Sequence, residues 1–426
     1  MSNNTRIVEK KYLVPFILIT CLFAFWGFAN DLTNPMVAAF KTIMEISNAK
    51  AALVQMAFYG GYATMAIPAA LFVQRFSYKK AILTGLALYA IGALMFWPAA
   101  KFETFGFFLG SLYILTFGLA FLETTANPFI LAMGSKETAT RRLNLAQAFN
   151  PMGSLLGMFA AANVLENLAS DKRNELGRLV FADLDETSKA LVRTNDLMII
   201  RNPYVILGVM VIIMFVVIAL VKIPQLGHAN HIKPIASIKR LMKNRIYREG
   251  VIAQMFYVAA QIMCWTFIIQ YAENIGISKS TAQVYNIVAM SLFLCSRFIS
   301  TFLMKYFNSR KLLILFAFGG MTTLLCTIFI VGIAGLYCLI ACSAFMSLMF
   351  PTIYGIALND IGDDATLGAA GLVMAIVGGA LMPPIQGAII DLEQIGFLPA
   401  VNVSFALPLL SFMVIAIFGV RSKYKG

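Results

Sequence analysis

The sequence predicts an all-α integral membrane protein with twelve transmembrane helices arranged as two bundles of six. Its composition points to this fold class, because 60% of the 426 residues are hydrophobic and only 12% are charged. Apolar runs recur along almost the whole chain, and a helix needs about 20 such residues to cross a bilayer. Short sequence patterns that repeat between the two halves predict the division into two bundles.

Twelve segments are apolar and long enough to span a membrane. They cover approximately residues 12–40, 50–73, 79–100, 104–134, 142–166, 201–223, 247–273, 279–304, 310–333, 335–358, 366–391 and 397–420. The first run continues from Tyr12 to Phe40 without a small-residue cleavage pattern. We therefore expect it to stay in the membrane as a helix, with no cleavable signal peptide.

Every second connection between the spans is rich in lysine and arginine, as the positive-inside rule requires. A net charge of +13 would also suit a nucleic-acid-binding protein, but this distribution favours topology, and no nucleic-acid partner is expected. With both termini in the cytoplasm, a cluster from Lys222 to Arg248 and most other basic connections share that side. These connections contain Arg6, Lys10, Lys11, Arg75, Lys79, Lys80, Lys136, Arg141, Arg142, Lys305, Arg310, Lys311, Arg421, Lys423 and Lys425. The one long loop on the other side, roughly residues 167–200, is charge-balanced.

The chain divides at a basic segment, residues 224–246, which is expected to be a cytoplasmic linker. The predicted parts are a cytoplasmic tail (1–11), an N-terminal six-helix bundle (12–223), the linker, a C-terminal six-helix bundle (247–421) and a second tail (422–426). The clearest repeat pairs LFVQRFSYKKAIL (71–83) with FLMKYFNSRKLLI (302–314). Both place a basic turn between the second and third spans of their half. Two parallel six-helix repeats are the architecture of the major facilitator superfamily, whose substrate site lies between the halves.

Glu123 lies in the middle of the fourth span, with no other charged residue between Glu103 and Lys136. An ionised acid at the centre of a bilayer costs about 2.5–3.5 kcal/mol on insertion scales. Such residues usually face a bundle interior or a water-filled cavity and mark a substrate or proton path. Glu123 is therefore the leading candidate for coupling transport to protons, against the alternative of a purely structural buried carboxyl.

Amides and aromatic residues on four spans are the candidate sugar ligands, because sugar hydroxyls both donate and accept hydrogen bonds and sugar rings suit an aromatic platform. The first span places Trp26, Asn30, Asp31 and Asn34 along one side. The candidate ligands are Asn30, Asn34, Asn127, Gln147, Asn150, Gln254, Tyr257, Gln261 and Trp265. The alternative for the amides is hydrogen bonding between helices, at roughly 0.6 kcal/mol each. Tyr257 and Trp265 could equally pack in the bundle or at the lipid interface.

The chain resembles the fucose permease branch of the major facilitator superfamily, the fucose/galactose/glucose:proton symporters. The resemblance rests on FWGFANDLTNP (25–35), QMAFYGGYATMAIPA (55–69), FLETTANPF (121–129), RLNLAQAFNPMG (142–153) and SAFMSLMFPTIY (343–354). It implies twelve helices, a rocker-switch cycle, and import of L-fucose or a related hexose driven by protons. In that family the glutamate of the ETxANP string is linked to the proton, and here it is Glu123.

The first span departs from the family pattern. The fucose permease has a string like ANNLND, whereas this chain reads ANDLTN, so Asn34 takes the expected acid position and Asp31 the expected amide position. Residues three apart share a helix face. Asp31 is therefore a second candidate for proton coupling, and its alternative is an acid that only polarises the outer vestibule.

Arg297 in the eighth span has two interpretations. It is eight residues from Lys305, a rise of about 12 Å along a helix, so its guanidinium could nearly reach the cytoplasmic interface. It could instead pair with Asp31 or Glu123 and gate the cavity.

The predicted function is a proton-coupled symporter that imports L-fucose or a similar hexose by alternating access. Glu123 would take up a proton outside, the loaded carrier would turn inward, and release of the proton would reset it. Partners are the sugar and the lipid bilayer of a bacterial inner membrane, and the chain is expected to act as a monomer. The proton is the coupling ion, and no cofactor or metal is expected.

The residues leave two other classes of function open. A sodium-coupled symporter of another hexose or amino sugar would use the same acids. A membrane sugar sensor is a further alternative, although no signalling domain is appended. No Walker string, paired histidines or nucleophile motif is present, so neither ATP-driven transport nor an enzyme is expected.

Overall fold

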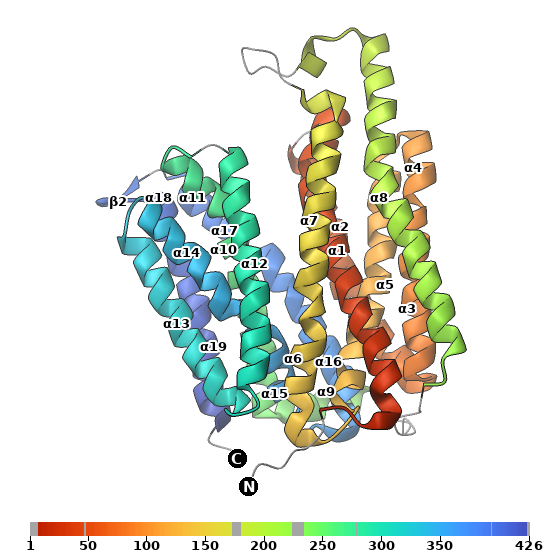
Figure 1. Ribbon diagram of the computed structural model, residues 1–426, viewed down its shortest axis with the longest axis vertical. Helices are drawn as coiled ribbons and strands as arrows, with labels where there is room; N and C mark the ends of the chain where they lie inside the picture. The colour runs from red at the N-terminus through yellow and green to blue at the C-terminus, as the bar shows by residue number, and fades with distance from the viewer. Residues whose placement is uncertain are drawn as a thin grey trace.

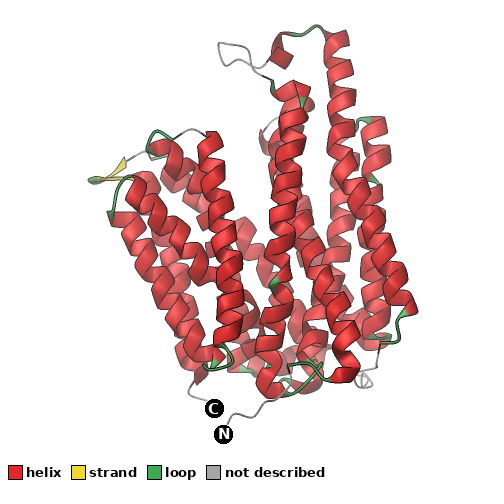
Figure 2. Ribbon diagram, in the orientation of Figure 1, coloured by secondary structure: helices red, strands yellow, loops and turns green. Residues whose placement is uncertain are grey.

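The computed structural model describes residues 7–46, 48–172, 180–223, 234–277, 279–392 and 394–423. It is helical almost throughout (Figure 2). Within the described residues, twelve helical segments are long and apolar enough to cross a membrane. They coincide with the twelve predicted spans, so the predicted fold class is confirmed.

The first half of the chain forms α1 to α8, which lie together on one side of the molecule (Figure 1). Their bounds are α1 (Leu13–Ile43), α2 (Asn48–Arg75), α3 (Tyr78–Leu94), α4 (Phe96–Phe102), α5 (Phe105–Leu131), α6 (Ala139–Gln147), α7 (Phe149–Asn167) and α8 (Glu186–Leu220). The second half forms α9 to α19 beside them. These are α9 (Pro234–Lys243), α10 (Arg245–Thr266), α11 (Ile268–Asn274), α12 (Lys279–Leu303), α13 (Ser309–Phe329), α14 (Ile333–Met346), α15 (Met349–Ala357), α16 (Ala365–Met374), α17 (Gly378–Ile390), α18 (Ala400–Ser404) and α19 (Ala406–Lys423). A short antiparallel pair, β1 (Gln394–Ile395) and β2 (Leu398–Pro399), joins α17 to α18.

The predicted linker, residues 224–246, is only partly a linker. Its first part, 224–233, lies outside the described residues. Its second part folds into α9, and α10 begins at Arg245. Arg240 of α9 forms a two-pronged ion pair with Asp364 at 2.8 and 2.7 Å, which ties α9 to the start of α16.

The paired basic turns have the same local structure in both halves, as the repeat predicts. After α2, Ser77 caps α3 by accepting a hydrogen bond from the Lys80 amide at 3.2 Å. After α12, Asn308 caps α13 by accepting from the Arg310 amide at 2.8 Å. Serine and asparagine favour this position because their side chains satisfy a free amide of the first helical turn.

The long outer loop predicted at 167–200 is wrong over its second half, because α8 begins at Glu186. Asp185 starts the helix by accepting a hydrogen bond from the Ser188 amide at 3.3 Å, and its contacts with Ser188 lower the pKa of this carboxyl. The 35 residues of α8 extend roughly 50 Å at 1.5 Å per residue, well beyond a hydrocarbon core of about 30 Å. The extension is polar, so hydropathy alone does not reveal it.

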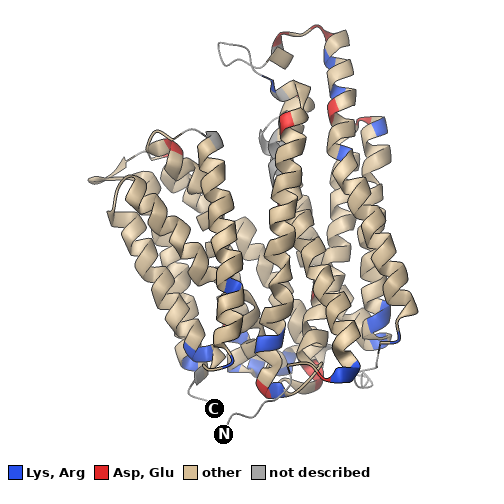
Figure 3. Cartoon of the chain, viewed as in Figure 1, with Lys and Arg blue, Asp and Glu red and all other residues tan. Residues whose placement is uncertain are grey.

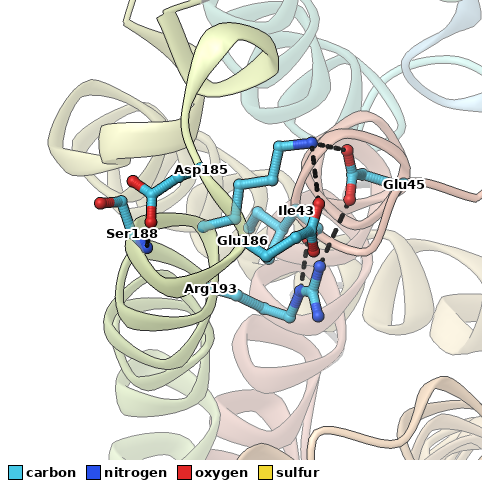
Figure 4. A network of polar contacts seen from close by, with 7 residues as sticks. Ile43, Glu45, Asp185, Glu186, Ser188 and Arg193 are labelled. Atoms are coloured by element: carbon cyan, nitrogen blue, oxygen red, sulfur yellow. Dashed lines mark hydrogen bonds and ion pairs between the residues drawn. The ribbon is translucent and has the colours of Figure 1, made fainter.

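The polar start of α8 is anchored to the end of α1 (Figure 4). Lys189 and Arg193 form ion pairs with Glu45 at 2.9 and 3.4 Å. Arg193 also donates a hydrogen bond to the Ile43 carbonyl at 3.2 Å. The extension is therefore held against the first helix.

Both chain ends lie at the same end of the molecule (Figure 1), and most lysines and arginines gather there (Figure 3). Among the described basic residues of the connections at this end, Arg142 is fully buried. Its guanidinium donates to the carbonyls of Ile130 and Leu131 at the end of α5, and to Ile7 at 2.8 Å. The buried guanidinium is thus satisfied by main-chain carbonyls at and beyond the end of α5 and at the start of the described chain.

The two halves are joined by polar contacts near this end. Tyr78 shares a hydrogen bond with Thr366 at 3.2 Å, and Asn144 donates to Thr352 at 3.2 Å. Lys136 pairs with Asp360 at 3.4 Å. The acidic connection after α15 therefore meets a basic residue of the other half.

Two glycines bring the backbones of α1 and α7 into contact. A Cβ atom added to Gly27 would lie 2.0 Å from the Asn150 carbonyl oxygen, and one added to Gly153 would lie 1.8 Å from that of Ala24. Only glycine fits at these positions. The close approach places the polar residues of α1 directly beside those of α7.

Candidate substrate and proton site

A cavity lies between the two halves at the level where several helices are interrupted. Its volume is about 140 Å³, and one water molecule needs roughly 10–15 Å³ by the same measure. Residues of α1, α2, α5, α6 and α7 form one wall, and residues of α10, α12 and α15 form the other. The breaks between α6 and α7 and between α14 and α15 fall beside it. The cavity has room for a small polyhydroxylated molecule.

Most of the predicted site residues meet in this cavity. Its lining includes Asn30, Asp31, Glu123, Gln147, Asn150, Tyr257, Gln261, Trp265 and Arg297. Asn127 and Gln254, predicted as sugar ligands, are fully buried and do not line it. The side chain of Asn34 lies outside the described part of the structure, so its predicted contact with sugar stays a prediction.

Asp31 sits among hydrogen-bond donors in the wall formed by α1 and α7. Ser154 of α7 and its own neighbour Asn30 are in position to donate to its carboxylate. Asn150, one turn before Ser154, donates to the Phe23 carbonyl of α1 at 3.3 Å. The Gly27 and Gly153 contacts keep these groups together. The Asp31 carboxyl therefore has donors beside it, and its oxygens can also accept hydrogen bonds from a substrate.

Glu123 occupies a different environment on α5. In the described chain, its carboxyl forms neither a hydrogen bond nor an ion pair. The hydroxyls of Tyr62 on α2 and Tyr354 on α15 are both close enough to interact with its charge. A carboxyl without a cation or donor in an apolar setting favours its neutral form. Glu123 is thus suited to bind and release a proton.

Asn127 acts on the cavity from behind its wall. It lies four residues after Glu123, and its side-chain oxygen accepts a hydrogen bond from Gln147 at 2.9 Å. Gln147 does line the cavity. Asn127 therefore orients a lining residue, which is the interhelical alternative for an amide rather than a direct ligand.

The C-terminal half contributes an aromatic wall. The Trp265 indole donates to Ser343 at 3.1 Å and packs edge-on against Phe293, with ring centroids 5.0 Å apart. Tyr257 donates its hydroxyl to the Met346 carbonyl at 3.1 Å. The polar atom of each ring is therefore hydrogen-bonded within the C-terminal half. Both rings line the cavity rather than facing lipid, so the lipid-interface interpretation is wrong.

Arg297 fits neither of its two predicted roles. Its side chain is 3% exposed, so it does not reach the cytoplasmic interface, and it forms no ion pair with an acid in the described chain. Its guanidinium instead donates to the Ser347 carbonyl of its own half and to the Gln147 carbonyl of the other half, the latter at 3.1 Å. Phe293 lies below the guanidinium at 4.6 Å. Arg297 therefore bridges the halves through main-chain oxygens that helix breaks leave free.

The cavity also contains residues that the sequence reasoning missed. Phe58, Tyr59 and Tyr62 of α2 line it, as does Phe293 of α12. Trp26, which the sequence placed on the same side of the first span as Asn30 and Asp31, lines it as expected, and its indole nitrogen has no hydrogen-bond partner among the described residues. The spacing of Tyr59 and Tyr62, three residues apart on one helix face, was the available signal. Aromatic residues are so common in spanning helices that this spacing did not single them out.

Twelve spans in two bundles around a polar cavity with a buried acid define the class of secondary transporters. The chain belongs to the Major Facilitator Superfamily, whose family model matches residues 17–383. The resemblance deduced from the sequence motifs is confirmed at this level.

Relatives of known activity match over nearly the whole chain. An L-fucose-proton symporter of Haemophilus influenzae is 62% identical over 422 residues, covering 98% of this chain and 99% of the relative. An L-fucose-proton symporter of Escherichia coli is 36% identical, covering 98% of this chain and 96% of the relative. A glucose/galactose transporter of Brucella abortus is 30% identical over 96% of this chain and 94% of the relative.

The fold is also similar to a crystal structure of the transporter FucP in the outward conformation. The TM-score is 0.87 at 34% identity, covering 97% of this chain and 99% of that one. The match extends over both halves, so their arrangement in the two proteins is similar.

Proposed function

We propose that this protein is a symporter that carries L-fucose or a closely related hexose together with a proton across a bacterial inner membrane. The observation that carries the proposal is Glu123, an acid without a cationic partner in the described chain, in the wall of a sugar-sized cavity between two bundles. Both the 62% and the 36% identical relatives are L-fucose-proton symporters, which supports the choice of substrate and ion.

The proposed roles follow from the two walls of the cavity. Asp31, Asn30, Gln147 and Asn150 hold sugar hydroxyls, while Trp265 and Tyr257 offer flat surfaces to the ring. Glu123 carries the proton, so that the proton-loaded carrier binds sugar and changes conformation. No cofactor is required. The cavity is formed by a single chain, which supports a functional monomer.

We further propose that both termini are cytoplasmic, with the basic end of the molecule facing the cytoplasm in accordance with the positive-inside rule. The hydrogen bonds between the halves near that end then close the cavity to the cytoplasm. The orientation is tested with reporter fusions at Asn3, Asn230 and Lys425, which should all report cytoplasm, and at Asp183, which should report the outside. A periplasmic signal at Asn230 contradicts it.

The function is tested by uptake of labelled sugars into proteoliposomes. We expect L-fucose to accumulate when an inward proton gradient is imposed and not when a sodium gradient is imposed at equal pH. Accumulation driven by a sodium gradient alone would show that sodium, and not the proton, is the coupling ion. No uptake of any hexose under either gradient would reject sugar symport.

The substrate preference is tested by competition. L-fucose should compete better than D-glucose or N-acetylglucosamine, because a site for a 6-deoxy sugar is apolar where other hexoses carry a hydroxyl. Burying that hydroxyl without a partner costs about 1–3 kcal/mol. Equal competition by D-glucose would indicate a broader hexose carrier.

A further inference from the structure

Polar side chains continue beyond the cavity, from Glu123 toward the end of the molecule that carries both termini. Asn127 of the N-terminal half and Tyr354 of the C-terminal half are both fully buried, and neither lines the cavity. Tyr354 lies close to the Asn127 amide and close enough to Glu123 to interact with its charge. Tyr354 of the C-terminal half thus lies near Glu123 of the N-terminal half without lining the cavity.

Several buried polar atoms in this region have no hydrogen-bond partner in the described chain. They are the Tyr354 hydroxyl, the Asn127 amide nitrogen and both side-chain atoms of Gln254. Gln254 belongs to α10, which packs against the helix of Tyr354, α15. Leaving a buried donor or acceptor unsatisfied costs about 1–3 kcal/mol, so such groups usually bind ordered water. The interface between the halves therefore holds buried donors and acceptors that are free to bind water.

The next hydroxyls lie beyond Tyr354 in the same direction. Tyr78 and Tyr247 are both close enough to Tyr354 to interact with it electrostatically. Tyr78 is the first residue of α3, next to the basic turn after α2, and it bonds Thr366 of the other half at 3.2 Å. Tyr247 donates to the Gly368 carbonyl at 3.0 Å. Tyr78 and Tyr247 thus both place their hydroxyls against the first turn of α16, toward the basic end of the molecule.

We propose that Tyr354 relays the proton from Glu123 to the cytoplasmic side through water held by Asn127, Tyr354 and Gln254. The inference rests on the proposed function. The protonated Glu123 carboxyl gives its proton to a bound water, and that water protonates the Tyr354 oxygen as the original hydroxyl proton leaves to the next water. Tyr354 ends unchanged, Glu123 ends as a carboxylate, and one proton has moved toward Tyr78. No oxidant or other reactant is needed.

Other groups near Glu123 serve this route less well. Tyr62 on α2 also faces Glu123, but it lines the cavity and leads back into it. Arg297 on α12 is occupied by the Ser347 and Gln147 carbonyls and carries a charge that opposes a passing proton. Tyr354 belongs to the C-terminal half, lies outside the cavity lining and carries a hydroxyl that can both accept and donate a proton. A relay across the interface would link proton release to the contact between the halves.

The test compares two transport modes in proteoliposomes. Exchange of sugar by counterflow needs no proton release, whereas L-fucose-driven proton entry, recorded with a pH dye inside the vesicles, does. Tyr354→Phe should slow proton entry about tenfold or more, the scale of a lost proton-transfer group, and leave counterflow within about twofold. Tyr354→His should restore part of the proton entry, because an imidazole can both accept and donate a proton. The matched control is Tyr204→Phe. It removes another fully buried hydroxyl, which is hydrogen-bonded to Thr33 within the N-terminal half and is not part of the proposed relay.

Each outcome decides between the relay and a structural role. Slowed proton entry with intact counterflow, rescued by histidine and absent in Tyr204→Phe, supports the relay. Equal loss of both modes in Tyr354→Phe, or no loss of either, overturns it. If the unmodified protein shows no proton entry with L-fucose, the proposed function fails first, and that result is distinct from a failure of the relay.

Discussion

The two acids of the cavity differ in what surrounds them, and this difference separates their roles. Asp31 is beside the donors Ser154 and Asn30, which stabilise a carboxylate. Glu123 interacts electrostatically with the hydroxyls of Tyr62 and Tyr354, and in the described chain its carboxyl forms no hydrogen bond and no ion pair. Glu123 is therefore the candidate to bind and release the proton, and Asp31 the candidate to accept hydrogen bonds from sugar.

Replacing Glu123 by glutamine mimics its protonated form permanently. Glu123→Gln should still exchange L-fucose by counterflow but lose accumulation against a gradient, because no proton can be released. Glu166→Gln, at an exposed position of α7, is the control and should accumulate sugar normally. Undiminished accumulation in Glu123→Gln would remove the central role of this residue.

Replacing Asp31 by asparagine removes a charged hydrogen-bond acceptor from the cavity. Hydrogen bonds to charged groups contribute about 1.5–3 kcal/mol, so Asp31→Asn should raise the L-fucose concentration for half-maximal counterflow roughly tenfold or more. Asp185→Asn is a matched control outside the cavity, because asparagine caps a helix as well as aspartate. Restoring an acid one turn away with Asn34→Asp should recover part of the loss if both positions share the substrate-facing side. An unchanged concentration dependence in Asp31→Asn would exclude it as a ligand.

Sequence reasoning found the acids and most of the lining amides because a polar residue inside an apolar span is conspicuous. It placed Asn127 and Gln254 in the cavity, which they do not line. Periodicity shows which residues share a helix face, but not which part of that face points into the cavity. Asn127 is four residues from Glu123, and this small rotation is enough to move it from the cavity wall to a bond with Gln147. It did not identify Arg297 as a bridge. Pro151 and Pro351 stand four residues after Gln147 and Ser347 and leave those carbonyls without an amide partner, but the sequence does not show that Arg297 reaches them.

At the scale of elements, the sequence predicted every membrane span but not the start of α8. Hydropathy detects the apolar part of a helix, and the first turns of α8 are polar and depend on Glu45 of another element. The close contact between α1 and α7 is likewise a property of the pair. The contact between these two helices brings Ser154 beside Asp31.

The α1–α7 contact predicts a strong effect of one added methyl group. Gly27→Ala should impair folding and transport, because its Cβ would lie 2.0 Å from the Asn150 carbonyl oxygen and overpacking costs about 1–3 kcal/mol. Gly110→Ala in α5, where nothing lies within 4 Å of the added carbon, should be as stable as the unmodified protein or more so. Thermal unfolding in detergent and L-fucose uptake measure both variants. Equal stability of the two would contradict the close backbone contact.

At the scale of the whole molecule, the polar contacts between the halves gather near the end that carries both termini. Tyr78 with Thr366, Asn144 with Thr352 and Lys136 with Asp360 all join the two bundles there. A cycle that opens the cavity to this end must break them. These contacts are individually weak, so they can be exchanged for others without a large barrier.

A crosslink at this end should therefore stop the cycle in one state. The Lys136→Cys and Asp360→Cys double variant replaces side chains that meet at 3.4 Å, and oxidation or a short bifunctional reagent should join them. We expect crosslinking to abolish both uptake and counterflow, and reduction to restore them. Each single variant treated identically is the control. Full transport in the crosslinked protein would show that the halves do not separate there.

The bridge made by Arg297 has a genetic consequence. Both of its partners, the oxygens of Gln147 and Ser347, belong to the main chain, so exchanging either side chain leaves an acceptor in place. Substitutions at positions 147 and 347 therefore leave the bridge intact. If the guanidinium of Arg297 is lost, however, no substitution at these two positions can restore the bridge. Second-site suppressors of an Arg297 substitution should consequently map to other contacts between the halves, such as those of Tyr78, Asn144 and Lys136.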